Sequence, residues 1–281
     1  MKPRGSTGTT TYPRLALGLS AAILFLFLCG PARSFAQSRR WRAGASTPVV
    51  FHRLLCAALG VRVRVHGRPA PAARRLIVAN HVSWLDIPVL GSVAPMTFLA
   101  KKEVGAPAWG GRLARLQGLI LVDRQRRRGI PRVNAEMVEA MTRGEAVVLF
   151  AEATTGDGNR ILRFRSSHFE AVRQAAASQG AAGDAVVQPV FLDYSRLGGL
   201  AVERRQRPLL AWYGDMTFFG HFWRLLRAGR VVCDVHFGPP IPVSGDSRRK
   251  VIARSTEISV RDLAGRARRP TWPIPAGLSS S

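Results

Sequence analysis

Apolar runs of four to seven residues alternate along most of the chain with longer segments in which apolar residues recur at helical spacing. The short runs predict strands, and the longer segments predict helices. This alternation is typical of an α/β fold built on a mixed, largely parallel sheet flanked by helices. We expect Pro189 to break the predicted strand 186–192, because proline cannot donate a ladder hydrogen bond. The predicted strands are 61–66, 76–79, 97–100, 119–122, 146–150, 186–192 and 231–237, and the predicted helices are 48–59, 84–92, 107–116, 131–142, 167–178, 218–226 and 246–266.

Residues 15–30 form an uninterrupted apolar run with basic residues on both sides. A helix that spans a bilayer needs roughly 17–25 residues, so this run is short for one. Two interpretations stay open: an uncleaved membrane anchor or interfacial helix, and a secretory signal with a cleavage site at Ser34-Phe35-Ala36. We favour the anchor, because nothing in the remaining sequence resembles a disulfide framework. The expected fold therefore includes an N-terminal hydrophobic membrane-associated segment.

Composition divides the chain into four parts. Residues 1–14 are predicted to be disordered, and residues 15–45 contain the anchor and a basic linker. Residues 46–266 form one folded domain, and residues 267–281 form a loose tail. The three cysteines (Cys29, Cys56 and Cys233) lie far apart in apolar segments, which indicates reduced thiols in a cytosol-facing domain and no metal-binding pattern.

The chain carries a formal net charge of +25, and arginine supplies nearly all of it. Two explanations stay open. A basic surface attracts anionic lipids, nucleic acid or an acidic carrier protein. Alternatively, a compositional bias towards arginine and alanine accounts for part of the charge without any partner.

The segment Asn80-His81-Val82-Ser83-Trp84-Leu85-Asp86 directly follows the apolar strand 76–79. A histidine at a strand-to-helix turn, with a carboxylate five residues later, is a natural general base for deprotonating a hydroxyl. A structural interpretation is also open, in which Ser83 is the N-cap of the next helix and Asp86 completes a capping box. In that case His81 is an ordinary loop histidine.

Polar clusters follow three of the predicted strands at the point where each strand ends. His81 follows the strand 76–79, Asp123-Arg124 follows the strand 119–122, and Glu152 follows the strand 146–150. Because functional loops of such sheets gather at the carboxyl ends of the strands, we expect these side chains to converge at one edge.

Four segments resemble, in order and spacing, the four sequence blocks of the lysophosphatidic acid acyltransferase family of glycerolipid acyltransferases. They are Asn80–Asp86, Gly118–Arg124, Phe150–Gly158 and Val187–Val190. The resemblance implies that residues 46–266 are an acyltransferase domain in which His81 takes a proton from the acceptor hydroxyl and Asp86 orients His81.

The resemblance also implies the partners. Arg124 would contact the acceptor's phosphate and Glu152 would bind the acceptor, which is a lysolipid. The donor would be an acyl carrier protein or acyl-CoA, with no cofactor and no metal. The enzyme would work at the membrane surface, on the cytoplasmic face of a bacterial inner membrane.

The third block departs from the family's usual Phe-Pro-Glu-Gly-Thr-Arg. Ala153 replaces the glycine, and because a glycine there suits a positive φ, an alanine held in that conformation would lower activity. Thr155 replaces an arginine, so Thr154 and Thr155 offer hydroxyls and Asp157 adds a carboxylate. A carboxylate suits a zwitterionic head group that carries an amine. The loop resembles the branch that acylates lyso-ornithine lipid; the alternative acceptor is 1-acylglycerol-3-phosphate.

Two other classes of protein compete with an acyltransferase. A basic nucleic-acid-binding protein would use the charge, but the sequence has no zinc pattern, helix-turn-helix signal or aromatic RNA-binding motif. A hydrolase would use His81 on water, but the sequence has no Gly-x-Ser-x-Gly nucleophile motif. We therefore expect no nucleic-acid partner.

Overall fold

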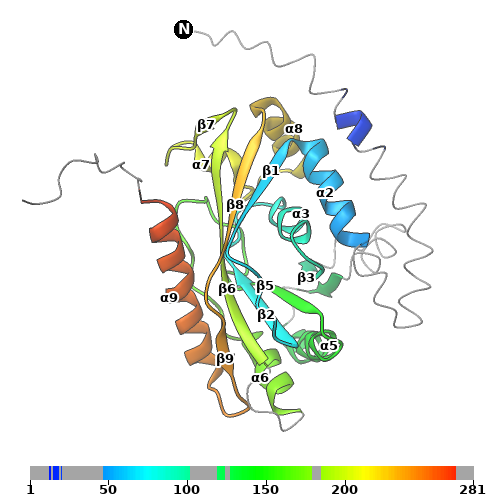
Figure 1. Cartoon of the computed structure of the whole chain (residues 1–281), viewed down its shortest axis with the longest axis vertical. Helices are drawn as coiled ribbons and strands as arrows, with labels where there is room; N and C mark the ends of the chain where they lie inside the picture. Colours follow the sequence, from blue (N-terminus) through cyan, green and yellow to red (C-terminus); the bar gives the residue numbers. More distant parts are fainter. Residues whose placement is uncertain are drawn as a thin grey trace, which may run out of the picture.

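The computed structural model describes residues 47–101, 119–123, 127–178 and 185–269, together with residues 13, 15–18 and 20. A single sheet runs through this part of the chain in the order β1-β8-β6-β2-β5-β3-β4, and β7 and β9 also pair with β6 (Figure 1). The strands are β1 (Val61–His66), β2 (Arg74–Ala79), β3 (Met96–Lys101), β4 (Leu119–Val122), β5 (Ala146–Phe150), β6 (Ala185–Leu197), β7 (Leu200–Ala201), β8 (Val231–Phe237) and β9 (Ile241–Val243).

Most strand pairs are parallel. Strands β6, β2, β5, β3 and β4 run in one direction, and β1 is parallel to β8. The antiparallel pairs are those of β6 with β7, β8 and β9. The predicted mixed, largely parallel sheet is therefore confirmed.

Helices cover both faces of the sheet (Figure 1). One face packs against residues of α2, α3 and α8, and the other packs against residues of α5, α6 and α9. The two layers bury the apolar faces of these helices, which is what makes short helices stable in this fold. The helices are α2 (Thr47–Leu59), α3 (Asp86–Gly91), η3 (Arg127–Gly129), α5 (Ile130–Thr142), α6 (Phe169–Ala177), α7 (Arg207–Leu210), α8 (Phe218–Ala228) and α9 (Arg249–Ala267).

The expected break at Pro189 is wrong, because β6 runs without interruption from Ala185 to Leu197. Pairing of β6 with β9 ends at Val187, and pairing with β8 begins at Val190. Pro189 lies between the two ladders, where its missing N–H costs no pairing. Its carbonyl still accepts a 2.8 Å hydrogen bond from the backbone amide of Gly238.

Two segments of the sequence prediction lie largely outside the described residues. They are the helix 107–116 and most of the apolar run 15–30. Among the residues that the structure describes, no helix is both long and apolar enough to cross a membrane. Cys56 and Cys233 are buried free thiols.

The C-terminal helix α9 continues to Ala267, and the side chain of Arg268 still contacts the domain. The folded domain therefore includes residues that the sequence prediction assigned to the tail. Residues 270–281 lie outside the described part of the chain.

Candidate active site

His81 and Asp86 form a buried pair at the carboxyl end of β2. The Nδ1 atom of His81 lies 2.8 Å from Oδ2 of Asp86, and the two residues are 8% and 0% exposed. A carboxylate only accepts hydrogen bonds, so this contact assigns the proton to Nδ1 and leaves the Nε2 lone pair available to take a proton. The ring of His81 also stacks on Phe150, with centroids 4.1 Å apart, which fixes the plane of the imidazole.

Asp86 accepts hydrogen bonds from the backbone amides of Val82 at 2.7 Å and Ser83 at 3.0 Å, in addition to the imidazole. The proposed N-cap role of Ser83 is wrong, because α3 begins at Asp86 and its N-cap position is Leu85, which makes no side-chain capping bond. Of the two bonds of a capping box, only the one from the backbone amide of Ser83 to the carboxylate of Asp86 is present. Asp86 thus fixes the loop and the imidazole together.

The sequence interpretation missed Tyr194, which lies on β6. Its hydroxyl donates a 2.6 Å hydrogen bond to Oδ1 of Asp86, the oxygen that His81 does not use. Burial and the neighbouring charge of Asp86 raise the pKa of Tyr194 well above its ordinary value, so the phenol stays protonated and remains a donor. No sequence signal pointed to this residue, because it is 108 positions from its partner.

Glu152 lies beside His81, as expected for two residues that follow the carboxyl ends of strands in one sheet. His81 follows β2, Glu152 follows β5, and the two strands are parallel neighbours. The backbone amide of His81 donates to Oε1 of Glu152 at 3.2 Å, and the carbonyl of His81 accepts from the amide of Gly156 at 2.9 Å. The third sequence block therefore holds the backbone of His81 on both sides.

The carboxyl of Glu152 is only 4% exposed. Burial raises the pKa of Glu152 to about 8, although the backbone amides of Leu162 and His81 act in the opposite direction. Glu152 is therefore mostly protonated at neutral pH, and a neutral carboxyl can both donate and accept hydrogen bonds.

The loop after Glu152 contains the other predicted acceptor-binding residues. Thr154 is exposed and Thr155 is partly buried. Burial opposes ionisation of Asp157, but hydrogen bonds from the amides of Asn159 and Arg160 hold its pKa below the ordinary value. The loop thus presents two hydroxyls and one ionised carboxylate.

Ala153 adopts a φ of 62°, the positive value expected for a position where the family carries glycine. An L-residue in the left-handed region is strained by about 1–2 kcal/mol, because its Cβ approaches the following carbonyl oxygen. The chain therefore stores strain directly beside Glu152.

The side chain of Arg268 binds the backbone of this loop. Its guanidinium donates to the carbonyls of Gly158 at 2.7 Å and Asn159 at 3.1 Å, and to Oδ1 of Asp193 at 3.3 Å. It also lies over the ring of Phe191, 5.0 Å from the centroid. Arg268 thus ties the end of α9 to the loop that begins at Glu152.

Arg124, the predicted phosphate-binding residue, lies outside the described residues. Asp123 precedes it and follows β4, which lies three strands from β2 in the sheet. That separation is roughly 14 Å, given a strand spacing of about 4.8 Å. Within the described ranges, no group of three or more His, Cys, Asp or Glu side chains is arranged to hold a metal ion.

Comparison with known proteins agrees with this geometry. A family model described as Acyltransferase matches residues 62–193. A solved structure, the 1-acyl-sn-glycerophosphate acyltransferase from Thermotoga maritima, shares the fold with a TM-score of 0.59 at 18% sequence identity, covering 91% of this chain and 98% of that one.

Curated relatives are more similar in sequence. The lyso-ornithine lipid O-acyltransferase of Brucella abortus is 39% identical over 77% of this chain and 80% of its own length, and that of Rhizobium meliloti is 38% identical over 87% and 84%. The 1-acyl-sn-glycerol-3-phosphate acyltransferase of Neisseria gonorrhoeae is 31% identical over 73% and 75%. On these matches, the chain belongs to the acyltransferase family and is an enzyme of that family.

Proposed function

We propose that this enzyme transfers a fatty acyl group from an acyl thioester to the hydroxyl of a lysolipid, and that the acceptor is lyso-ornithine lipid. The observation that carries the reaction is the buried pair of His81 and Asp86, in which Nδ1 is bound at 2.8 Å and Nε2 is left as the base. The donor is an acyl carrier protein or acyl-CoA, whose anionic character suits a chain of net charge +25.

In the proposed reaction, Nε2 of His81 takes the proton of the acceptor hydroxyl as its oxygen attacks the thioester carbonyl carbon. Asp86 stabilises the imidazolium that forms, and the hydrogen bond from Tyr194 holds Asp86 in place. The tetrahedral intermediate then collapses, the C–S bond breaks, and the leaving thiolate takes the proton back from His81. An ester and a free thiol are the products, and His81 returns to its starting state.

Two observations support lyso-ornithine lipid over lysophosphatidate as the acceptor. The loop at Thr154, Thr155 and Asp157 offers an ionised carboxylate, which suits the amine of an ornithine head group. Three relatives named lyso-ornithine lipid O-acyltransferase are 38–39% identical over 74–87% of this chain, and a fourth is 32% identical over 80%. Relatives named for the glycerol phosphate acceptor are 31% identical over 73% of the chain, or 36% identical over only 51% of it. In this proposal Glu152 and Arg124 both bind the acceptor, and Arg124 does so through an acidic group.

We further propose that the enzyme works on the cytoplasmic face of a bacterial inner membrane, with residues 15–30 as its anchor. The sequence of that run, apolar and flanked by basic residues, supports an anchor. Fractionation of cells that express the full chain tests this location, and recovery in a wash of the membranes at high pH contradicts an anchor.

The acceptor is tested by supplying the purified enzyme with acyl carrier protein charged with a fatty acid and either lyso-ornithine lipid or lysophosphatidate. We expect turnover of lyso-ornithine lipid, and a fall in that turnover for Asp157→Asn. Turnover of lysophosphatidate alone refutes the head-group assignment and leaves the acyltransferase reaction standing.

A further inference from the structure

Helix α8 has an outward face whose aromatic residues are exposed and are not part of the hydrophobic core. On its inward side Leu225 and Leu226 are buried, at 1% and 3% exposure. On its outward side Phe219 and Trp223 are exposed by 73% and 42%. Clustered exposed aromatic rings are costly in water, so such a face marks a surface that something covers.

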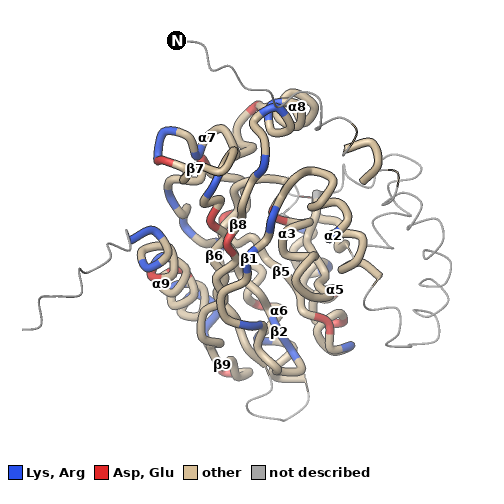
Figure 2. Tube along the Cα trace, turned by 45° about the horizontal axis from the view of Figure 1, so that its top comes forward, with Lys and Arg blue, Asp and Glu red and all other residues tan. Residues whose placement is uncertain are grey.

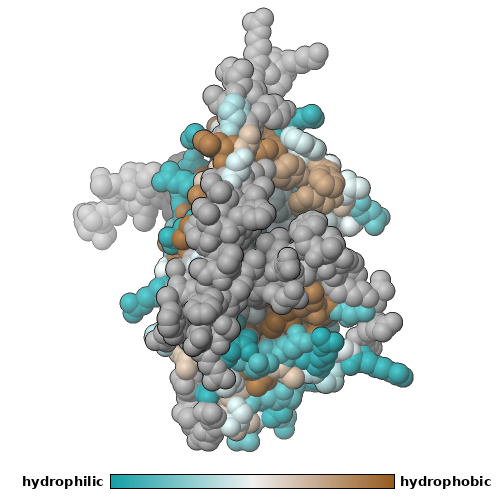
Figure 3. Space-filling model, turned by 90° about the vertical axis from the view of Figure 1, so that its right-hand side faces the viewer, coloured by the Kyte–Doolittle hydropathy of each residue, from teal (hydrophilic) through white to brown (hydrophobic). Residues whose placement is uncertain are grey.

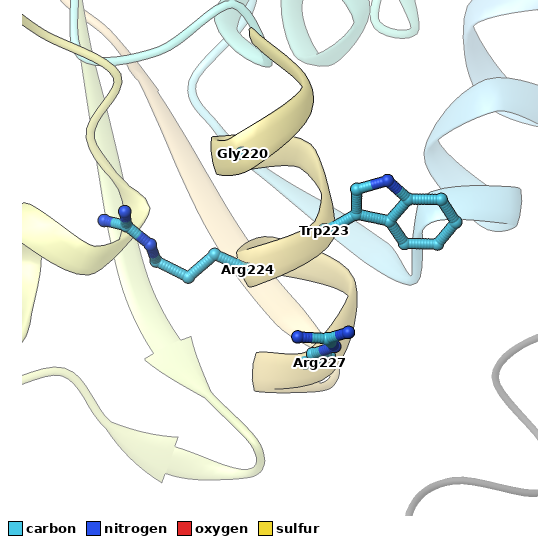
Figure 4. Close-up of a pocket in the computed structure, with 4 residues that line it drawn as sticks. All are labelled: Gly220, Trp223, Arg224 and Arg227. Carbon is cyan, nitrogen blue, oxygen red and sulfur yellow. The ribbon is translucent and has the colours of Figure 1, made fainter. Parts of the chain in front are cut away.

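Arginines lie directly beside these rings. Arg224 and Arg227 are exposed residues of α8, Arg230 follows the helix, and the helix contains no acidic residue. Within the described part of the chain, neither Arg224 nor Arg227 makes a side-chain hydrogen bond or an ion pair. With Gly220 and Trp223 they line an open groove, and Figure 4 shows Trp223 and Arg224 extending from opposite sides of the helix.

The neighbouring elements have the same character. Helix α7 contacts α8 and exposes Leu209 by 44%, and β7 exposes Leu200 by 74%. Arg204 and Arg205, just before α7, are exposed as well. Figure 2 shows basic residues, with a few acidic ones among them, around α7, β7 and α8, and the hydrophobic areas in Figure 3 include one near this end of the molecule.

We propose that this face, defined by Phe219, Trp223, Arg224 and Arg227, docks on the surface of a bilayer that contains anionic lipids. Aromatic rings insert at the depth of the head groups, and guanidinium groups bind lipid phosphates, as in other helices that lie in a membrane interface. A second copy of the chain is the poorer occupant, because a symmetric contact would bring the arginines of both copies together.

The inward side of α8 is bound to the loop that carries His81. The indole N–H of Trp84, which lies between His81 and Asp86 in sequence, donates to Nδ1 of His221 at 3.0 Å. The ring of Trp84 also contacts Phe218, with centroids 5.2 Å apart. A helix is about 10–12 Å across, so a bilayer on the outward face lies one helix diameter from this loop.

The inference rests on the proposed function and concerns how the enzyme meets its lipid acceptor. Docking of α8 brings the loop that carries Trp84 and His81 next to the bilayer that supplies the acceptor lipid. The docked helix thereby fixes both the height and the orientation of the active site above the membrane, in addition to the tether that the proposed N-terminal anchor supplies.

Depth-dependent quenching tests the docking without requiring turnover. The full chain carrying Cys29→Ala and Phe219→Cys is labelled with an environment-sensitive fluorophore; the other two cysteines are buried. Vesicles of phosphatidylcholine and phosphatidylglycerol with brominated acyl chains are then added. The matched control is Val251→Cys, an exposed apolar position of α9 that is 58% exposed.

We expect bromine quenching at position 219 and none at position 251. Absence of quenching at 219 overturns the proposal, and so does self-quenching at 219 that grows with protein concentration without lipid, since that marks contact between copies. Because the signal needs no acyl transfer, a wild type that fails to acylate lyso-ornithine lipid refutes the proposed function and leaves this result unaffected.

Activity gives a second measurement. For Phe219→Asp, we expect the ratio of activity on acceptor in vesicles to activity on acceptor in detergent micelles to fall about tenfold. For Arg224→Gln with Arg227→Gln, binding to phosphatidylglycerol vesicles should weaken about tenfold, with less dependence on salt. Val251→Asp is the control for both. An equal loss in vesicles and micelles contradicts docking, because it indicates damage to the fold.

Discussion

The hydroxyl of Tyr194 donates a 2.6 Å hydrogen bond to Oδ1 of Asp86, the carboxylate that also binds the catalytic candidate His81 through its other oxygen. Both side chains are buried, so the bond cannot be replaced by bulk water. Tyr194 therefore acts through Asp86 as a positioning residue for the imidazole.

Tyr194→Phe removes this bond and keeps the ring. A hydrogen bond to a charged group contributes about 1.5–3 kcal/mol, so we expect kcat to fall about tenfold or more. KM for the acceptor should change little, because Tyr194 contacts Asp86 and not the proposed head-group loop. Steady-state kinetics checks this. Tyr213→Phe, a tyrosine outside the Asp86 network, is the control, and an equal fall in kcat for both variants contradicts the role.

Arg268 fixes the acceptor loop through three acceptors, the carbonyls of Gly158 and Asn159 and the carboxylate of Asp193. Lysine keeps the charge but lacks the planar fork, so Arg268→Lys should release the loop. Because misplacing a binding group weakens productive binding, we expect KM for the lysolipid to rise about tenfold and kcat to change less. Arg266→Lys, exposed on the last turn of α9, is the control. A fall in kcat with unchanged KM would contradict the role of Arg268 in positioning the acceptor loop.

Glu152 should make stability depend on pH. Its pKa is about 8 in the folded protein and 4.5 as an ordinary carboxyl, so between these values the folded state holds the extra proton. The free energy of unfolding therefore falls as pH rises, by about 1.4 kcal/mol per pH unit within this window. Denaturant titrations of Glu152→Gln at pH 5 to about 8 should lack that slope. Glu203→Gln, an exposed glutamate, should keep it; a parallel slope in both variants argues against a buried proton on Glu152.

Ala153 offers a stabilising substitution. Its φ of 62° suits glycine, so Ala153→Gly should raise the free energy of unfolding by about 1 kcal/mol. Chemical denaturation measures the change. The neighbouring buried Ala151 is the matched control, because its φ is not positive and Ala151→Gly should destabilise the protein by adding backbone freedom to the unfolded chain. Destabilisation by both substitutions would mean that Ala153 is not strained.

Periodicity predicted the parallel core of the sheet well, because each of its strands is a short apolar run between helices. The strand predicted from periodicity ended at Leu192, however, because Asp193-Tyr194-Ser195 is polar. The structure extends β6 to Leu197, since β8 pairs with it along that stretch. That long-range pairing places Tyr194 beside Asp86, and no local pattern encodes it.

The candidate site also contains residues that local sequence patterns predict and residues that only long-range contacts bring into place. His81, Asp86 and Glu152 were found from their positions at strand ends and from a family resemblance, and the structure brings them together. Arg268 was missed because a charged residue at the end of a helix is usually solvated, and here its partners lie about a hundred residues earlier in the chain. Contacts of this kind depend on the folded arrangement of α9 against the loop.

The most direct test of the central claim is the rate of acyl transfer to lyso-ornithine lipid by His81→Ala in a membrane preparation. General base catalysis contributes about 10²- to 10⁴-fold, so we expect a loss of at least about a hundredfold, with wild-type amounts of folded protein. His66→Ala, a half-exposed histidine on the edge strand β1, should retain most of the rate. A rate near that of the wild type for His81→Ala would show that His81 is not the general base.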